Sequence, residues 1–249
     1  MRKKLYVDGV DLSTFGVYVT GTGTYGAPER KIEMMDIPNR NGAILGIDKS
    51  YSNINVSYPC FIYASLESNI AALRSFLLSR SGYVKIRDDY HSGEFRMGIY
   101  DGPFNPTIQK RGDAGSFTLT FSCMPQRFLD SGEVAITGLK DGGTFTNPTR
   151  FTSKPIINFI DLYYGCNVTV NDVTFALNFG VVQDSFNITL DCETMDCFDT
   201  DDGTSYNDKL TTTDFRFPEL ISGVNTVVVT SAAWGYPADL TITPRWWTL

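Results

Sequence analysis

Apolar and polar residues alternate along most of the chain with a period of two, which is the pattern of antiparallel strands that bury one face. Residues 117–123 place two phenylalanines, a leucine and a cysteine on one face, and threonine and serine on the other. The same alternation occurs in residues 166–177, 185–192, 227–230 and 240–243. The pattern therefore predicts a mainly β protein.

Residues 65–82 break this alternation, because their apolar residues recur at helical spacing. These residues are Leu66, Ile70, Leu73 and Leu77. Ser65 is a suitable N-cap and Gly82 a suitable C-terminal stop. The segment predicts one amphipathic α-helix whose apolar stripe lies across a sheet, so we expect it to serve packing and not ligand binding.

Turn signals divide the strands into two groups. Asp8-Gly9 and Asn171-Asp172 are typical of tight hairpin turns. Residues 128–155 are rich in turn formers, and they separate strands plus the helix from a region of strands alone. We therefore predict two β domains, residues 1–138 and 139–249. The first is expected to be an antiparallel, sandwich-like β domain with one α-helix.

The most definite turn in the chain is Pro38-Asn39-Arg40-Asn41-Gly42, inside the segment KIEMMDIPNRNGAIL at residues 31–45. Proline restricts the backbone at the start of this turn. Glycine at its end allows backbone conformations that other residues rarely adopt. The segment contains no histidine, no nucleophile and no phosphate-binding loop. A turn of this kind without reactive groups favours a role in shape.

Composition limits the classes of partner. The 249 residues are 42% hydrophobic and 13% aromatic, which is ordinary for a globular β protein. The formal net charge is −7. Duplex-binding proteins gain affinity by neutralising phosphates with basic residues, so this balance argues against wrapping nucleic acid. It is compatible with a surface that a polyanion passes without binding.

The five cysteines are odd in number and form no CxxC pair. They are Cys60, Cys123, Cys166, Cys192 and Cys197. Cys123, Cys166 and Cys192 share the apolar parity of their strands, so we expect reduced core residues. The basic N-terminus leads into no apolar signal core, and no stretch approaches the roughly 18 apolar residues that span a bilayer. We expect no classical secretion signal and no membrane association.

Two segments have the letters of binding motifs but not their context. GTGTYG at residues 21–26 fits the dinucleotide-binding pattern, yet Ala27-Pro28 and an extended run follow where a helix should begin. DCFDTDDGTSYND at residues 196–208 resembles a calcium loop, but aligning its glycine places Phe198 and Lys209 at ligand positions. We interpret the second segment as a solvated acidic hairpin tip.

Candidate catalytic groups are sparse. His91 is the only histidine and lies in a polar turn beside Asp88 and Asp89, so we expect all three to be solvated surface residues. No pair among the 28 acidic residues is marked by spacing as a glycosidase pair. Trp246 and Trp247 are expected to seal a β-sandwich, with sugar stacking as the alternative. We predict no enzymatic activity, no cofactor and no metal.

Six blocks resemble, in type and order, the distal tail protein family of long non-contractile-tailed bacteriophages of Gram-positive hosts. The blocks are residues 7–21, 37–45, 115–129, 190–198, 215–229 and 242–249. The family turn reads Pro-Gly-Arg-(Asp/Asn)-Gly, and here Asn39 replaces the first glycine. Asparagine is the non-glycine residue that best tolerates positive φ, so the turn can persist.

The resemblance implies a fold and a set of partners. The C-terminal domain would be a galectin-like β-sandwich at the periphery of a hexameric ring formed by the N-terminal domain. The ring would be a structural hub in the virion tail, assembled in the host cytoplasm. It would join the major tail tube protein to a tail-associated adhesion or lysin protein, and it can anchor a receptor-binding protein. Genomic DNA would cross its central channel without specific binding.

We hypothesise that residues 31–58 form an extended hairpin that reaches a neighbouring subunit. The oligomer interface is then predicted to include Pro38, Asn39, Arg40, Asn41 and Gly42. Two other function classes remain open on the sequence. One is a carbohydrate-binding module that uses Trp246, Trp247 or Trp234 as a platform, and the other is a wall hydrolase.

Overall fold

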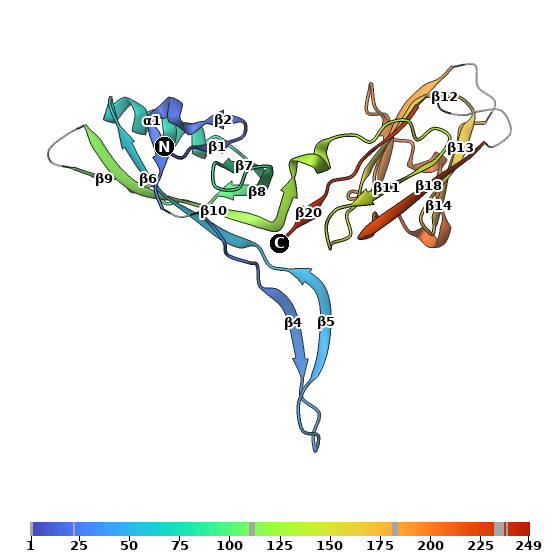
Figure 1. Ribbon diagram of the computed structural model, residues 1–249, viewed down its shortest axis with the longest axis horizontal. Coiled ribbons are helices and arrows are strands. Elements are labelled where there is room, and N and C mark those ends of the chain that lie inside the picture. Colours follow the sequence, from blue (N-terminus) through green and yellow to red (C-terminus); the bar gives the residue numbers. More distant parts are fainter. Residues whose placement is uncertain (1, 22, 110–112, 181–183, 232–236, 238) are drawn as a thin grey trace. The chain divides into compact units, whose positions relative to one another are not determined.

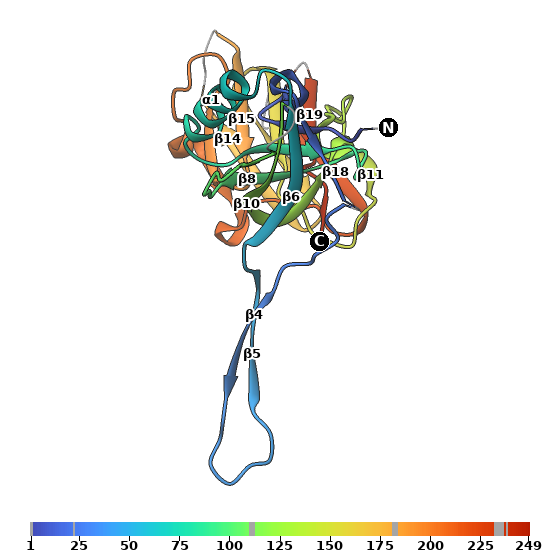
Figure 2. The same ribbon diagram turned by 90° about the vertical axis from the view of Figure 1, so that its left-hand side faces the viewer.

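The computed structural model describes residues 2–21, 23–109, 113–180, 184–231, 237 and 239–249. It contains two compact units, Met1–Arg127 with Leu249 and Phe128–Thr248, each with its own hydrophobic core (Figures 1 and 2). The predicted mainly β fold with one α-helix is confirmed. Leu129 and Ile136 pack against the second core. The functional boundary after residue 138 stays a prediction.

Within its described residues, unit 1 contains ten strands, one α-helix and a short 3-10 helix. The elements are β1 (Leu5–Val7), β2 (Val10–Asp11), η1 (Leu12–Phe15), β3 (Val17–Val19), β4 (Arg30–Met35), β5 (Ile44–Tyr51), β6 (Ile54–Tyr63), α1 (Leu66–Leu78), β7 (Val84–Asp88), β8 (Glu94–Tyr100), β9 (Thr107–Ile108) and β10 (Ala114–Leu129). Its main sheet has the order β2-β1-β7-β8-β10-β6-β3, with β9 beside β10.

The pairing of β6 with β10 forms the centre of this sheet. Their register runs from Ala114↔Tyr63 to Cys123↔Ile54 without a shift. On β10 the four apolar side chains of residues 117–123 are buried, as the alternation predicts. Their partners on β6 alternate in the same way, so the two strands bury one common face.

Helix α1 packs its apolar stripe on the core of unit 1. Leu66, Leu73 and Leu77 are buried there, which confirms the predicted packing role. Ser65 occupies the N-cap position, but its side chain makes no capping bond. The carboxylate of Asp113 instead accepts a hydrogen bond from the Leu66 N–H at 3.1 Å. This cap comes from 47 residues away and could not be read from local sequence.

Unit 2 is a sandwich of two antiparallel sheets. Its strands and 3-10 helices are η2 (Asp130–Glu133), β11 (Gly143–Asn147), β12 (Ile156–Leu162), β13 (Gly165–Val170), β14 (Val173–Asn178), β15 (Phe186–Asp191), β16 (Asp196–Asp199), η3 (Asn207–Lys209), β17 (Leu210–Thr212), η4 (Thr213–Phe215), β18 (Gly223–Ser231), β19 (Asp239–Thr243) and β20 (Trp247–Thr248). One sheet has the order β11-β18-β13-β14-β17 and the other β16-β15-β12-β19.

The predicted hairpin at residues 166–177 is present as β13 and β14. Cys166 pairs with Leu177 and Val170 with Val173, and all of these side chains are buried. Asn171, at the predicted turn, has a φ of 54°. A left-handed residue at this place matches the twist of a two-residue hairpin turn, which explains why asparagine stands there.

All five cysteines are free thiols buried in the two cores. The three that share the strand parity are at most 1% exposed, as predicted. Burial raises the pKa of Cys60, Cys166 and Cys192 to about 12. These thiols therefore behave as small apolar side chains and not as nucleophiles. No helix within the described ranges is long and apolar enough to cross a membrane.

Asp191 and Arg245 form a bidentate ion pair in unit 2. The two guanidinium nitrogens lie 2.8 and 2.7 Å from the two carboxylate oxygens. Burial acts to raise the pKa of the Asp191 carboxyl, but hydrogen bonds from Arg245 and from backbone N–H groups outweigh it and lower the pKa below 3.8. The pair thus stabilises the fold above the ordinary aspartate pKa and loses this effect as pH falls through the lowered native value.

We expect Asp191→Asn to lower the free energy of unfolding by about 2 kcal/mol at neutral pH. In urea unfolding, the difference from the native chain should shrink as pH falls below the ordinary aspartate pKa, because the unfolded chain then binds a proton that the ion-paired native carboxylate does not. An equal difference at both pH values would contradict this assignment. Asp196→Asn, at an exposed position of the neighbouring strand β16, is the control and should have little effect at either pH.

Candidate functional site

Strands β4 and β5 form a separate two-stranded antiparallel sheet, and we call residues 30–51 the arm. Figure 2 shows the two strands extending away from the main sheet of unit 1. Every residue from 29 to 45 is exposed. The predicted hairpin over residues 31–58 is therefore real but shorter. Residues 54–63 belong to β6, because their alternating apolar side chains bury against the main core.

The predicted interface residues, 38–42, lie together at the tip of the arm. The Arg40 N–H donates to the Ile37 carbonyl at 3.2 Å, which closes a four-residue turn with Pro38 second and Asn39 third. Asn39 has a φ of 64°. A proline followed by a residue of positive φ is the signature of a type II turn. The structure thus explains the asparagine, while the contact of this tip with a neighbour stays a prediction.

The arm carries apolar side chains that its own two strands cannot bury. Cross-strand pairs place Met34 opposite Leu45 and Met35 opposite Ile44. Met34 is 70% exposed and Leu45 is 48% exposed, and Ile32 on the same face is 47% exposed. We call Ile32, Met34 and Leu45 the apolar stripe. A two-stranded hairpin is only marginally stable in water, so a stripe of this kind is typical of a surface that another chain covers.

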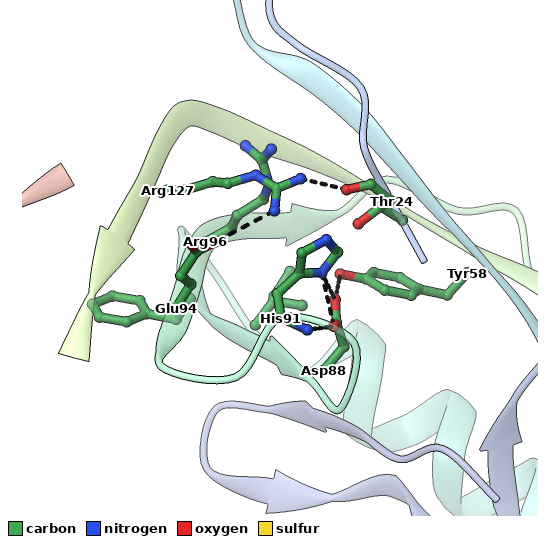
Figure 3. A pocket seen from close by; sticks show the side chains of 9 residues that line it. Thr24, Tyr58, Asp88, His91, Glu94, Arg96 and Arg127 are labelled. Carbon is green, nitrogen blue, oxygen red and sulfur yellow. Dashed lines mark hydrogen bonds and ion pairs between the residues drawn. The ribbon is translucent and has the colours of Figure 1, made fainter. Parts of the chain in front are cut away.

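Before the arm begins, Thr24 lies beside a cluster of polar side chains from β6, β7, β8, β10 and the turn between β7 and β8 (Figure 3). The carboxylate of Asp88 is the centre of this cluster. It accepts hydrogen bonds from the Tyr58 hydroxyl and from the backbone N–H groups of Tyr90 and His91, all at 2.9 Å. Nδ1 of His91 lies 3.0 Å from the same carboxylate.

The expectation that Asp88 and His91 are solvated is wrong. Their side chains are 5% and 14% exposed, whereas Asp89 is exposed as predicted. For Asp88 the reason is strand parity: Val84, Ile86 and Asp88 point to one face, and that face is the core. This signal was present in the sequence, but the polar neighbourhood of residues 87–95 concealed it.

Two arginines complete the cluster. Arg96 is 5% exposed and donates to the Pro125 carbonyl at 3.3 Å. Burial, and then the charge of Arg127, lower the pKa of Arg96. Arg127 is 9% exposed and lies 3.4 Å from the Glu94 carboxylate. Burial, and then the charge of Asp88, raise the pKa of Tyr58, so its hydroxyl stays a donor.

The chemistry of the cluster is that of a structural network. The cavity that these side chains enclose has a volume of about 10 Å³. Small-molecule sites have volumes of several hundred Å³, while this space suits about one water molecule. Histidine is a common general acid or base in enzymes, but the His91 side chain is only 14% exposed. It contacts the Asp88 carboxylate and the Tyr25 ring. The arrangement can hold side chains in place, and it has no room for a substrate.

A larger open groove in unit 1 has a volume of about 590 Å³. Threonine, serine, proline and asparagine line it, together with Cys60. Its lining residues include no carboxylate, histidine or lysine, and the Cys60 thiol has a pKa of about 12. These side chains supply neither a general base nor an activated nucleophile.

The two tryptophans that the structure describes, Trp246 and Trp247, do not form an open platform for a sugar. Trp246 is 4% exposed and belongs to the core of unit 2, so the predicted sealing role holds for it. The ring of Trp247 stacks on the ring of Phe151, with centroids 4.4 Å apart, and its N–H donates to the Thr152 carbonyl. Trp234, the third candidate of the carbohydrate alternative, lies outside the described residues.

The acidic segment at residues 196–208 forms β16 and a turn. The carboxylates of Asp199 and Asp202 accept hydrogen bonds at 2.8 Å from the backbone N–H groups of Asp201 and Thr204. The hydrogen bonds from Thr204 lower the pKa of Asp202. Across the described ranges, no group of three or more histidine, cysteine or acidic residues is placed to hold a metal ion. The carboxylates here organise their own turn.

Comparisons with known proteins now bear on this geometry. Residues 10–123 match the family model of the phage tail protein RIFT-related domain. No curated protein matches the chain. Among solved structures, the crystal structure of Dit (gp 19.1) of phage SPP1 matches over 100% of both chains, with a TM-score of 0.76 and 15% sequence identity. That protein is described as a paradigm of the hub adsorption apparatus in Gram-positive-infecting phages.

The matched domain contains the arm and most of the cluster at its base, and the structural likeness extends through unit 2. At 15% identity the likeness establishes a common fold. The resemblance to the distal tail protein family is therefore confirmed: the chain carries a phage tail protein RIFT-related domain and has, over its whole length, the fold of SPP1 Dit.

Proposed function

We propose that this protein is a structural hub at the distal end of a phage tail, where six copies close into a ring. The arm is the observation that carries the proposal. Its exposed apolar stripe belongs to a domain of the phage tail type and to a chain with the fold of a hub protein. A closed ring needs the same head-to-tail contact at every subunit, and an arm that reaches one neighbour supplies that contact.

Burial of the apolar stripe can stabilise such a contact between subunits. Burying a side chain such as isoleucine, leucine or methionine contributes about 1.5–3 kcal/mol. The three residues of the apolar stripe are about half to two-thirds exposed, so together they contribute roughly 2.5–5 kcal/mol at each interface, before backbone hydrogen bonds are counted. The outer edges of β4 and β5 can add such bonds by pairing with a strand of the neighbour.

The ring joins the tail tube protein on one side to an adhesion or lysin protein on the other, and it can anchor a receptor-binding protein. DNA crosses its channel during ejection. The net charge of −7 supports this part, because a surface without a basic excess does not retain a polyanion. The hub is assembled in the host cytoplasm and acts in the virion tail.

Light scattering on purified protein tests the placement of the interface. The full chain should run as a closed oligomer, and deletion of residues 38–42 should leave a folded monomer. Circular dichroism of the deletion variant should retain the β signal of the native chain, since the tip is exposed and packs on neither core. A deletion variant that still forms the oligomer would refute this placement of the contact.

The carbohydrate-binding alternative has less support. Its described candidates, Trp246 and Trp247, are engaged with the rest of unit 2 through burial, stacking and a hydrogen bond. A sugar platform needs an aromatic face open to solvent. A shift of the monomer on cell-wall glycan in affinity electrophoresis would favour this alternative over the hub.

A further inference from the structure

We infer that Gly21, Thr24 and Tyr25 are clamped to the main sheet of unit 1, and that this clamp fixes the direction in which the arm leaves the unit. We call these residues, together with Tyr90, His91 and Arg127, the clamp. The inference deepens the proposed function, and its consequence for assembly rests on that function. The clamp itself is a property of the single chain.

Three side chains of unit 1 hold these residues, one from β10 and two from the turn between β7 and β8. The Tyr90 hydroxyl donates to the Gly21 carbonyl at 2.7 Å. The guanidinium of Arg127 donates to the Thr24 carbonyl. The ring of Tyr25 meets the ring of His91 edge-on, with centroids 5.3 Å apart. The segment is thus bound at its beginning and at its end by groups on β10 and on the turn between β7 and β8.

The glycines of GTGTYG have a role in this contact. Gly21 and Gly23 have φ values of 104° and 94°, a region that other residues rarely adopt. A Cβ atom at Gly23 would lie 3.2 Å from the Cβ of Tyr90. The glycines therefore let the backbone turn and approach the Tyr90 side chain closely. The motif letters that suggested dinucleotide binding are explained by the path of the chain.

The holding groups are themselves immobilised. Asp88 fixes both the backbone and the ring of His91, as Figure 3 shows. Arg127 is 9% exposed and also contacts Glu94. Buried side chains with several polar partners have little rotational freedom, so they transmit the position of the sheet to the segment that they hold.

Clamping one strand of the arm fixes both strands. On the β5 side the chain continues after two residues into β6, which lies in the main sheet. On the β4 side, β3 and then Thr20 are hydrogen-bonded to β6, and the clamp holds the residues that follow them before the arm begins. At the base, the Ser52 N–H donates to the Glu29 carbonyl at 2.9 Å, and Arg30 donates to the Tyr51 hydroxyl at 3.1 Å. The arm therefore has two fixed points at its base and a defined direction.

The double variant Tyr25→Ala/Tyr90→Phe tests the clamp with little risk to folding. Tyr25 is 76% exposed, and the second change removes a single hydroxyl group. Tyr163→Ala/Tyr6→Phe is the matched control, since it removes the same atoms from an exposed tyrosine of unit 2 and from a tyrosine of β1. Both variants are compared with the native chain at a concentration where light scattering shows monomers.

Hydrogen exchange in the monomer is the first measurement. Peptides covering residues 46–53 include the Ser52 N–H, which donates to the Glu29 carbonyl at the base of the arm. They should exchange about tenfold faster in the clamp variant, because the base opens more often, and peptides from α1 and β10 should be unchanged. The control should match the native chain throughout. Unchanged exchange in residues 46–53 of the clamp variant would overturn the inference.

The direction of the arm is measured with two spin labels, at Arg40→Cys on the tip and Glu67→Cys on α1. The five native thiols are at most 2% exposed, so labelling is confined to these two sites. The clamp variant should broaden the distance distribution, and an unchanged width would overturn the inference. Both measurements use monomers, so they judge the clamp even if the chain never forms a ring. If the ring forms, the clamp variant should form it at a higher protein concentration than the control.

Discussion

Replacing Ile32, Met34 and Leu45 by threonine is expected to convert the assembled protein into folded monomers. The three side chains are 47%, 70% and 48% exposed on the arm, so the changes remove no core contact. Threonine is β-branched, so it suits a strand at all three positions. The loss of roughly 2.5–5 kcal/mol at each interface weakens each contact by about two to four orders of magnitude.

The double variant Lys31→Thr/Glu33→Thr is the control for this change. Its residues lie on the same strand as Ile32 and Met34, are also exposed, and point to the other face of the arm. Sedimentation velocity should show monomers for the stripe variant and the native oligomer for the control. A stripe variant that keeps the native mass would contradict the role of the apolar stripe.

Asp88→Ala is expected to lower the free energy of unfolding of unit 1 by about 3 kcal/mol. The side chain is 5% exposed, and its carboxylate accepts from the Tyr58 hydroxyl and from two backbone N–H groups. Removing it leaves these buried donors without partners, and an unsatisfied buried donor costs about 1–3 kcal/mol. His91 also loses the group that orients its ring.

The neighbouring Asp89→Ala is the control, because Asp89 is exposed although its carboxylate accepts from the Lys4 N–H. Its effect should stay below about 1 kcal/mol. Thermal unfolding followed by circular dichroism measures both variants. Equal and small effects of the two changes would contradict the assignment of Asp88 as the centre of the cluster.

Local patterns were sufficient to predict most of the fold. The alternation in residues 117–123 and 166–177 identified buried strand faces, and the spacing of leucines identified α1. Asn39 and Asn171 were placed correctly at turns, because the left-handed backbone there has few alternatives to glycine and asparagine. These features depend on neighbours along the chain, so the sequence shows them directly.

Features that join distant residues were not predicted. Asp191 and Arg245 are 54 positions apart, and Asp113 reaches the start of α1 across 47 positions. The same limit applies to the clamp, where Arg127 contacts Thr24 across 103 positions. The sequence offers many possible pairs of acidic and basic residues. Only the packed structure determines which of these residues meet. His91 was misjudged for this reason, since its surroundings come from four different strands and loops.

The division of the arm from β6 shows how tertiary structure sets a boundary. Residues 31–58 read as one long hairpin, because the strand pattern continues through β5 into β6. The structure separates them at Ser52 and Asn53, where the chain passes from an exposed hairpin into the buried face of the main sheet. Exposure distinguishes the two parts, and exposure depends on the whole unit.

Native mass spectrometry with electron-microscope class averages of the intact chain tests the central claim, that copies of this protein lock arm to neighbour in a closed ring. We predict one dominant species of six times the monomer mass, and averages with a central hole and sixfold symmetry. A chain that stays monomeric at every concentration, or that grows into open filaments of no fixed mass, would contradict the claim.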